Sequence, residues 1–375
     1  MTNRERLLAV LNGRIPDFVP VCPDISNMVP CRLTGKPYWD VYLRNDPPLW
    51  QAHINALKHF DLDGGFEMYR YPDPLGDAPV YETRILKREP GRIITRDYFT
   101  GKGEWAKYLW VYFENEAPAA YITPAKVGLP EIPERYELMD NAKQWPDGMT
   151  LWRMIRKEMG EQGLMGMPSG MQTCLLNTAD DVYDYYDKPA VFHKKAEQML
   201  ELSLRRIERI SKFPKEDRPD FLACGASGSL ILQTPTIFRE LMLPVLKEVT
   251  KAAKKAGIPT QVHSCGPETA LVRMAVEETD LTVIDPLEIS PMGDCDLAAL
   301  KKEFGGRIVL KGNLHTTDVM LYGSVQDVID ASKKAIDDAA EGGGFILSTG
   351  DQCGRDTPFE NIMAMVETAR TYGKY

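Results

Sequence analysis

Two short apolar runs, Arg307-Ile-Val-Leu-Lys311 and Gly344-Phe-Ile-Leu-Ser348, flank a helical pattern at Val325–Ala340. Apolar residues in that pattern recur every three to four positions, which places them on one face of a helix. The two runs have the length of strands and few polar residues, as is typical of parallel strands covered on both faces. Strands of this kind alternating with helices predict a parallel sheet with helices outside it.

The same alternation extends upstream to the N-terminus. Eight candidate strands lie at residues 17–21, 65–68, 163–167, 220–224, 261–263, 281–285, 307–311 and 344–348. Helical patterns lie at residues 49–59, 180–211, 235–255, 268–278, 296–304, 325–340 and 359–372. Because eight parallel strands close a barrel, we expect an α/β fold of the (β/α)8 TIM-barrel type, as a single domain over residues 1–375. An N-terminal helical extension at residues 4–13 precedes it, and an open doubly wound sheet is the alternative.

Residues of about 77–125 interrupt this alternation. Polar and apolar residues alternate at Val80–Arg84, Arg92–Tyr98 and Tyr108–Phe113, with turn signals between these segments. We therefore expect an antiparallel hairpin insertion that overhangs the barrel end at which active sites lie. Its aromatic residues alternate as hairpin packing residues do, and forming a roof over an aromatic substrate is the other interpretation. These residues are Trp105, Tyr108, Trp110, Tyr112 and Phe113.

Composition narrows the class of protein. The chain has 375 residues, with 45 Lys and Arg against 54 Asp and Glu, and a net charge of −9. Without a basic cluster it lacks what binding to nucleic acid or to an anionic membrane surface requires. No run approaches the roughly 18 apolar residues of a membrane span, and the first residues lack the apolar core of a signal peptide. The seven cysteines do not suggest a disulfide framework, so we expect a cytoplasmic protein with free thiols.

The most distinctive local sequence is His263-Ser-Cys265-Gly266, at the end of a predicted strand. Residues two apart in a strand point to the same side, so His263 and Cys265 can bind one ion. Cys353 follows the last predicted strand, and a barrel brings the ends of its strands to one rim. One imidazole and two thiolates suit Zn²⁺ with a fourth position open, as in catalytic zinc sites. The alternatives are that these residues only pack in the core and that Cys22 is the third ligand.

Several motifs together resemble the uroporphyrinogen decarboxylase superfamily. They are His263-Ser-Cys265-Gly266, Leu310-Lys-Gly312-Asn313, Gly344-Phe-Ile-Leu-Ser348, Cys353-Gly354 and Thr357-Pro358-Phe359-Glu360-Asn361-Ile362. Within the superfamily, the chain is similar to the branch of zinc-dependent, corrinoid-linked methyltransferases. The resemblance extends along the whole chain and is loose between roughly residues 80 and 160. It implies that His263, Cys265 and Cys353 bind Zn²⁺, and that a partner protein carries the corrinoid (cobalamin).

The chain departs from true uroporphyrinogen decarboxylases at two places. Those enzymes carry a Met-Arg-Gln-Ala-Gly-Arg segment after the first strand, where this chain reads Pro23-Asp24-Ile25-Ser26-Asn27-Met28. They also carry Gly-His-Gly where this chain has Gln352-Cys353-Gly354. A substrate with many carboxylates needs Arg partners, and Asp24 would repel it. Porphyrinogen decarboxylation is therefore the weaker interpretation.

Further polar residues near the predicted strand ends complete the candidate site. Asp285 ends the sixth strand, where methyltransferase relatives have an acid near the metal. We expect Asp285 to be a fourth ligand or to support the site, with helix capping as the alternative. Glu288 is a less favoured candidate for the same role. Asn313 ends the seventh strand and is expected to contact the substrate or cofactor, or else to cap a turn. Glu67 roughly aligns with an acidic residue of the family, and His315 is a candidate base or an ordinary loop residue. We place Asp285, Asn313 and Glu67 among the catalytic residues.

The resemblance implies methyl transfer, with zinc as a Lewis acid and the corrinoid protein as the other methyl carrier. We favour O-demethylation of a methoxylated aromatic compound, because the chain is similar overall to O-demethylase components and the insertion is rich in aromatic residues. The alternatives are methylation of a thiol such as coenzyme M, use of another methyl donor, and a non-catalytic barrel that only docks a corrinoid protein. The direction of transfer and the oligomeric state are open, with a homodimer as one option.

Overall fold

The computed structural model describes residues 1–67, 73–76, 81–139, 146–226 and 228–375, and the chain divides into two compact units. The first, here called the barrel unit, comprises Met1–Asp24, Leu57–Tyr69 and Met159–Tyr375. The second, here called the insertion unit, comprises Ile25–Ala56 and Arg70–Glu158. The interpretation of residues 1–375 as one domain stays a prediction.

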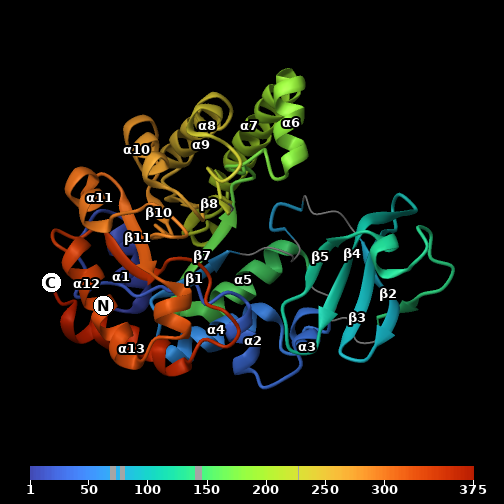
Figure 1. Ribbon diagram of the computed structural model, residues 1–375, viewed down its shortest axis with the longest axis horizontal. Coiled ribbons are helices and arrows are strands. Elements are labelled where there is room, and N and C mark those ends of the chain that lie inside the picture. Colours follow the sequence, from blue (N-terminus) through green and yellow to red (C-terminus); the bar gives the residue numbers. More distant parts are fainter. Residues whose placement is uncertain (68–72, 77–80, 140–145, 227) are drawn as a thin grey trace. The chain divides into compact units, whose positions relative to one another are not determined.

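Parallel strands form the sheet of the barrel unit. Among the described residues there are seven, in the spatial order β1-β7-β8-β9-β10-β11-β12, and helices lie outside them (Figure 1). Each strand is hydrogen-bonded to the next one along the unit, as in a βα barrel. This confirms the predicted α/β fold of the TIM-barrel type. The strands are β1 (Gly64–Glu67), β7 (Gly163–Pro168), β8 (Phe221–Ala226), β9 (Thr260–His263), β10 (Val283–Asp285), β11 (Val309–Leu314) and β12 (Phe345–Thr349).

The prediction of an eighth strand at residues 17–21 is wrong, although the segment lies where that strand would lie. Val21 forms an isolated parallel bridge with Leu347 of β12. On its other side, the Val21 carbonyl accepts a hydrogen bond of 2.9 Å from the N–H of Asp63, the residue before β1. A continuous ladder does not form because Pro20 lies inside the segment and has no N–H group to donate. The segment therefore links β12 to the start of β1 without being a strand itself.

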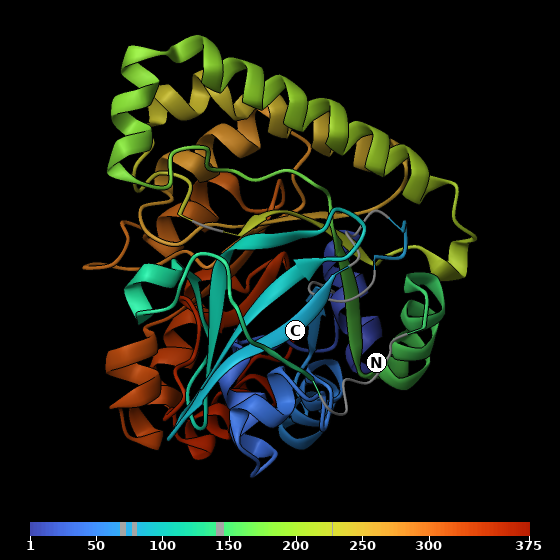
Figure 2. The same cartoon turned by 90° about the vertical axis from the view of Figure 1, so that its right-hand side faces the viewer.

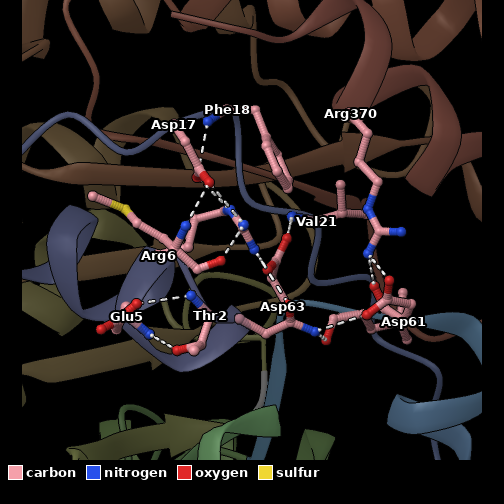
Figure 3. Close-up of polar contacts among 12 residues, drawn as sticks. Thr2, Glu5, Arg6, Asp17, Phe18, Val21, Asp61, Asp63 and Arg370 are labelled. Carbon is pink, nitrogen blue, oxygen red and sulfur yellow. Dashed lines mark hydrogen bonds and ion pairs between the residues drawn. The ribbon is translucent and has the colours of Figure 1, made fainter.

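Helix α1 (Asn3–Leu11) closes the N-terminal end of the barrel and confirms the predicted helical extension. Its Arg6 forms ion pairs with Asp17 and Asp63 (Figure 3). Its buried apolar face packs on residues near the N-terminal ends of several strands. This cluster comprises Leu7, Val10, Leu164, Val283, Val309 and Ile346. With that end of the barrel filled, the C-terminal ends of the strands are left to form a site.

Most helices of the barrel unit lie close to their predicted positions. α13 (Phe359–Tyr372) has the predicted bounds, and α10 (Thr269–Glu278), α11 (Leu297–Phe304) and α12 (Val325–Ala339) each differ by one residue.

Two predicted helices are each interrupted. Residues 180–211 form α6 (Ala179–Asp187) and α7 (Pro189–Ser211), and residues 235–255 form α8 (Pro235–Leu241) and α9 (Leu243–Lys255). A proline opens the second helix of each pair, at its first or second position, because proline cannot donate to the preceding turn. The long helix α7 packs along α9 (Figure 2).

An antiparallel sheet forms the core of the insertion unit, in the order β5-β4-β3-β2-β6 (Figure 1). The antiparallel character is as predicted, but the sheet extends beyond the expected hairpin of residues 77–125 to Leu138, and residues 77–80 lie outside the described residues. Trp105 packs edge-on against Tyr98 and Tyr136, with ring centroids 5.1 and 5.7 Å apart, so it packs within the sheet. The strands are β2 (Glu82–Glu89), β3 (Arg92–Phe99), β4 (Glu104–Phe113), β5 (Ala119–Ile122) and β6 (Glu137–Leu138). The remaining helices of the chain are α2 (Met28–Leu33), α3 (Tyr38–Tyr42), α4 (Leu49–Phe60) and α5 (Gly148–Met159).

Within the described part of the chain, none of the helices has the length and the apolar composition that crossing a membrane would require.

Candidate metal centre

The candidate site is built from residues at the C-terminal ends of three strands. His263 is the last residue of β9 and pairs in register with Asp285, the last residue of β10. Cys265 lies two residues beyond His263, and Asp351 lies two residues beyond the end of β12. The parallel sheet thus brings residues from distant parts of the sequence to one rim, as the barrel prediction requires.

His263, Cys265 and Asp351 form a cluster with the geometry of a metal site. The His263 Nε2 atom lies 3.3 Å from the Cys265 Sγ atom and 3.6 Å from an Asp351 carboxylate oxygen. One ligand atom from each residue lies within 4.8 Å of the others. A tetrahedral zinc ion with ordinary bond lengths places a nitrogen and a sulfur ligand about 3.5 Å apart, and a nitrogen and an oxygen ligand about 3.3 Å apart. The donor set and its spacing therefore fit Zn²⁺.

Asp285 holds His263 from the side away from this cluster. Its Oδ2 atom lies 3.2 Å from His263 Nδ1 and accepts a hydrogen bond of 3.0 Å from Lys311 Nζ, and its Oδ1 atom accepts one of 2.8 Å from Gln261. Burial alone would raise the pKa of Asp285, but Lys311 and His263 hold it well below its usual range. A carboxylate on Nδ1 leaves Nε2 for a metal, an arrangement common among metal-binding histidines.

The charges around His263 also shift its own titration. Burial would lower the pKa of His263, whereas Asp285 and Asp351 raise it well above its ordinary value. A metal ion bound at Nε2 takes the place of the proton there.

Cys353 does not belong to this cluster. Its side chain is fully buried, and its N–H donates a hydrogen bond of 2.7 Å to the Asp24 carbonyl. Burial raises the pKa of the Cys353 thiol to about 12, whereas a metal ligand must be a thiolate. The role of Cys353 as a zinc ligand stays a prediction. Cys22, the rival ligand, is likewise outside the cluster, and burial raises its pKa.

Asp351 is the residue that sequence reasoning missed. It stands two positions before Cys353, and both residues lie in the loop after β12, where side chains no longer alternate as they do in a strand. Its φ of 149° is a backbone conformation that residues other than glycine rarely adopt. This conformation accompanies the placement of its carboxylate beside His263.

The other predicted residues are placed less decisively. Asn313 lies within β11, half-buried and in register with Ser348. Glu67 ends β1, but its side chain lies outside the described residues. His315 accepts hydrogen bonds at Nδ1 from the N–H groups of Thr317 and Asp318, so it caps the following helical turn. The roles of Asn313 and Glu67 in catalysis stay predictions.

Two glutamates connect the loop after β9, which carries Cys265, with the loop after β10. Glu288 accepts a hydrogen bond from the N–H of Gly266, next to Cys265. In the opposite direction, Glu268 accepts one of 2.6 Å from the N–H of Leu287. Each loop thus supplies a carboxylate to the backbone of the other, which holds Cys265 in place relative to β10. Glu288 is a support of the site in this structure and not a member of the cluster.

A pocket of about 370 Å³ opens beside Cys265. Its lining residues are Leu230, Ile231, Cys265, Gly266, Pro267, Glu288, Met292 and Asp351, all of which belong to the barrel unit. The pocket is large enough for a small organic molecule next to the candidate metal centre.

Comparison with curated proteins gives relatives of two kinds. Methylcobamide:CoM methyltransferase MtbA of Methanosarcina acetivorans is 28% identical over 135 residues, which cover 36% of this chain and 37% of that protein. Methylcobamide:CoM methyltransferase MtaA of Methanosarcina barkeri is 23% identical over 99% of this chain and 98% of its own. A uroporphyrinogen decarboxylase of Anaeromyxobacter dehalogenans is 22% identical over half of each chain. The chain therefore spans little more than a third of the length of MtbA.

A solved structure supports the fold. The chain is similar to a methyltransferase from Methanosarcina mazei, with a TM-score of 0.65, 19% identity and 99% of each chain covered. The predicted resemblance to the methyltransferase branch of the superfamily is confirmed by these relatives. The family model described as uroporphyrinogen decarboxylase (URO-D) matches residues 163–372, more than half of the sequence. The chain belongs to the uroporphyrinogen decarboxylase family.

Proposed function

We propose that this protein is a zinc-dependent methyltransferase that moves a methyl group from a methoxylated aromatic compound to the corrinoid of a partner protein. The observation that carries the proposal is the pair His263–Cys265, two soft ligands 3.3 Å apart at the edge of a pocket. A decarboxylase that binds a polycarboxylate has no need of such a pair. The third ligand is Cys353, as the sequence predicts, or Asp351, which belongs to the observed cluster.

The chemistry requires charge stabilisation and positioning. Zinc bound at this centre would supply a Lewis acid that stabilises negative charge on the ether oxygen as it leaves. The methyl–oxygen bond breaks while the electron pair of the reduced corrinoid substrate forms a bond to the methyl carbon. The oxygen keeps the bonding pair and then takes a proton from water.

The residues of the chain contribute mainly orientation in this scheme. Asp285 fixes the ring of His263, and Lys311 keeps Asp285 charged. Glu288 anchors the loop that carries Cys265. Asn313 and Glu67 are proposed to contact the substrate or the cofactor.

Methylation of a thiol such as coenzyme M is the second candidate. It is favoured by the similarity to MtbA and MtaA, which are methylcobamide:CoM methyltransferases. In that direction the metal would activate the thiol as a thiolate, and the methyl group would leave the corrinoid. The same centre and the same pocket serve both reactions.

The test is methyl transfer with the zinc-loaded full chain and free reduced cobalamin, whose absorption spectrum changes on methylation. We expect turnover with a methoxylated aromatic compound and none in Cys265→Ser. The control is Cys174→Ser, since Cys174 donates only to the nearby Leu176 carbonyl and serine can do the same. Uroporphyrinogen is expected to remain unconverted. Conversion of uroporphyrinogen, or full activity in Cys265→Ser, would overturn the proposal.

The third ligand is identified by comparing Cys353→Ser with Asp351→Asn. We expect about one zinc per chain in the wild type, and a large loss of zinc and of activity in the variant that removes the true ligand. Losing such an electrophilic group commonly lowers the rate about 10²–10³-fold. If Cys353 only packs in the core, Cys353→Ser instead lowers the melting temperature with normal zinc content.

A further inference from the structure

We propose that the pocket beside Cys265 selects uncharged substrates and rejects anionic ones. The preference applies both to methyl donors and to thiol acceptors. The inference rests on the proposed function and narrows its substrate class. It is carried by the charges and the apolar surface of the pocket.

One wall of the pocket is apolar and open to solvent. Ile231 and Met292 line it with 60% and 61% of their surface exposed, and Pro267 lies with them. A Cβ atom at Gly228 would stand 2.2 Å from Ile231 and 2.9 Å from the Cys265 carbonyl, so glycine there lets the wall approach the cysteine. An apolar group, such as an aromatic ring or an alkyl chain, would cover this wall on binding.

The charged residues of the lining are both acidic. Glu288 and Asp351 line the pocket, and none of the described lining residues is Lys, Arg or His. The nearby Lys311 is buried and bonded to Asp285. His315 is not among the lining residues, and its Nδ1 atom accepts hydrogen bonds from two backbone N–H groups.

The charge of the metal does not reverse this balance. A Zn²⁺ ion held by the Cys265 thiolate and by a second anionic ligand has its two positive charges cancelled. If that second ligand is Cys353, both Glu288 and Asp351 remain as negative charges; if it is Asp351, Glu288 remains. A carboxylate or sulfonate entering the pocket would therefore lose hydration without gaining a cationic partner, and would be repelled as well. A neutral phenol ether or a neutral thiol has neither cost.

The experiment compares pairs of compounds that differ mainly in charge. With the zinc-loaded chain and reduced cobalamin, 2-methoxyphenol is compared with 2-methoxybenzoate as methyl donor. With methylcobalamin, 2-mercaptoethanol is compared with coenzyme M as acceptor. We expect kcat/KM to favour the uncharged member by at least about tenfold in whichever direction is active. Glu288→Gln should reduce this preference, while Glu201→Gln, at an exposed site on α7 paired with Arg205, should leave it unchanged.

Equal or better use of the anionic member, or a preference that Glu288→Gln leaves unchanged, would overturn the inference while methyl transfer itself stands. Absence of transfer with all four compounds would overturn the proposed function instead. In that case, calorimetric binding of 2-methoxyphenol and 2-methoxybenzoate decides the inference, because the charge of the pocket does not depend on turnover. Tighter binding of the benzoate would refute it, and tighter binding of the phenol would support it.

Discussion

Asp285 sets the geometry of the candidate metal centre at the scale of single residues. Its two oxygens serve His263, Lys311 and Gln261. An oxygen that faces His263 Nδ1 and accepts from a buried ammonium is poorly placed to bind the metal as well. The observed contacts therefore favour Asp285 as the residue that orients His263, over its alternative expected role as a fourth ligand.

Replacing Asp285 by Asn should lower zinc affinity about 10–100-fold while the protein remains folded. Asparagine keeps the size of the side chain but removes the charge that fixes His263 and balances Lys311. The measurement is competition for zinc with a chelator of known affinity, run beside a thermal melt. Asp330→Asn, on the exposed face of α12 where Asp330 accepts from Gln326, is the matched control. Unchanged affinity in Asp285→Asn would show that His263 needs no such support.

The pair His263–Cys265 could be predicted because both residues lie at the end of one strand, at a spacing of two. Asp351 and Cys353 could not be ranked in this way, because Gly350 ends the regular strand geometry after β12 and the following loop decides which side chain faces the rim. Lys311 belongs to the motif Leu310-Lys-Gly312-Asn313, but its role depends on a contact with Asp285 in the neighbouring strand, and one sequence does not reveal such a pairing.

At the scale of elements, the first pair of strands depends on glycine. Gly64 of β1 pairs with Gly163 of β7. A Cβ atom at Gly163 would stand 2.1 Å from the Gly64 carbonyl oxygen, and backbone cannot give way as a flexible side chain can. The close approach of these two strands therefore requires the absence of a side chain at Gly163.

Gly163→Ala should lower the free energy of unfolding by about 1–3 kcal/mol, the usual cost of overpacking. The measurement is urea-induced unfolding. Gly354→Ala is the control, because a Cβ atom there would have no neighbour within 4 Å. A Gly163→Ala variant as stable as the control would mean that β1 and β7 can separate without cost.

The strand and helix pattern after residue 160 could be read from the sequence because each element is a whole apolar run or a full helical face. The failures have local causes. Residues 17–21 have a strand-like composition, yet Pro20 prevents a continuous ladder. The helix breaks before α7 and α9 follow from prolines inside otherwise continuous apolar patterns. In the insertion unit, β5 and β6 are short, with four and two residues, and such elements carry too little pattern to predict.

At the scale of the whole molecule, we expect the fold of the barrel unit not to depend on the candidate metal centre. The centre lies at the C-terminal ends of the strands, whereas α1 and its apolar cluster fill the opposite end. We expect the protein to keep a cooperative thermal transition after zinc is removed by a chelator, at a melting temperature lowered by the lost binding energy. Calorimetry with and without chelator measures this. Loss of the transition would show that the metal holds the fold together, as in a zinc finger.

The N-terminal end of the barrel unit is held by ion pairs that join distant parts of the chain. Arg6 of α1 pairs with Asp17 and with buried Asp63, and Arg370 of α13 pairs with Asp61 (Figure 3). Asp63 also accepts a hydrogen bond of 3.0 Å from the Val21 N–H. These contacts fix the segment that takes the place of an eighth strand.

Because Asp17 is part of these ion pairs, the stability of the folded protein should depend on pH in the acid range. Burial alone would raise its pKa, but hydrogen bonds from Arg6 and from the N-terminal amine lower it to about 2, below its ordinary value of 3.8. A carboxylate with a lowered pKa in the folded state stabilises that state above its unfolded pKa, and this contribution is lost as the pH falls through the folded pKa. Wild-type protein should therefore be more stable than Asp17→Asn at pH 5, and most of the difference should be lost as the pH falls from about 4 to about 2. Because 37% of the Asp17 side chain is exposed, solvent screening keeps the difference at pH 5 to about 1 kcal/mol or less. Urea unfolding of both proteins across this range measures it, with Asp330→Asn as the control, and a difference as large at pH 2 as at pH 5 would show that Asp17 acts through packing and not through its charge.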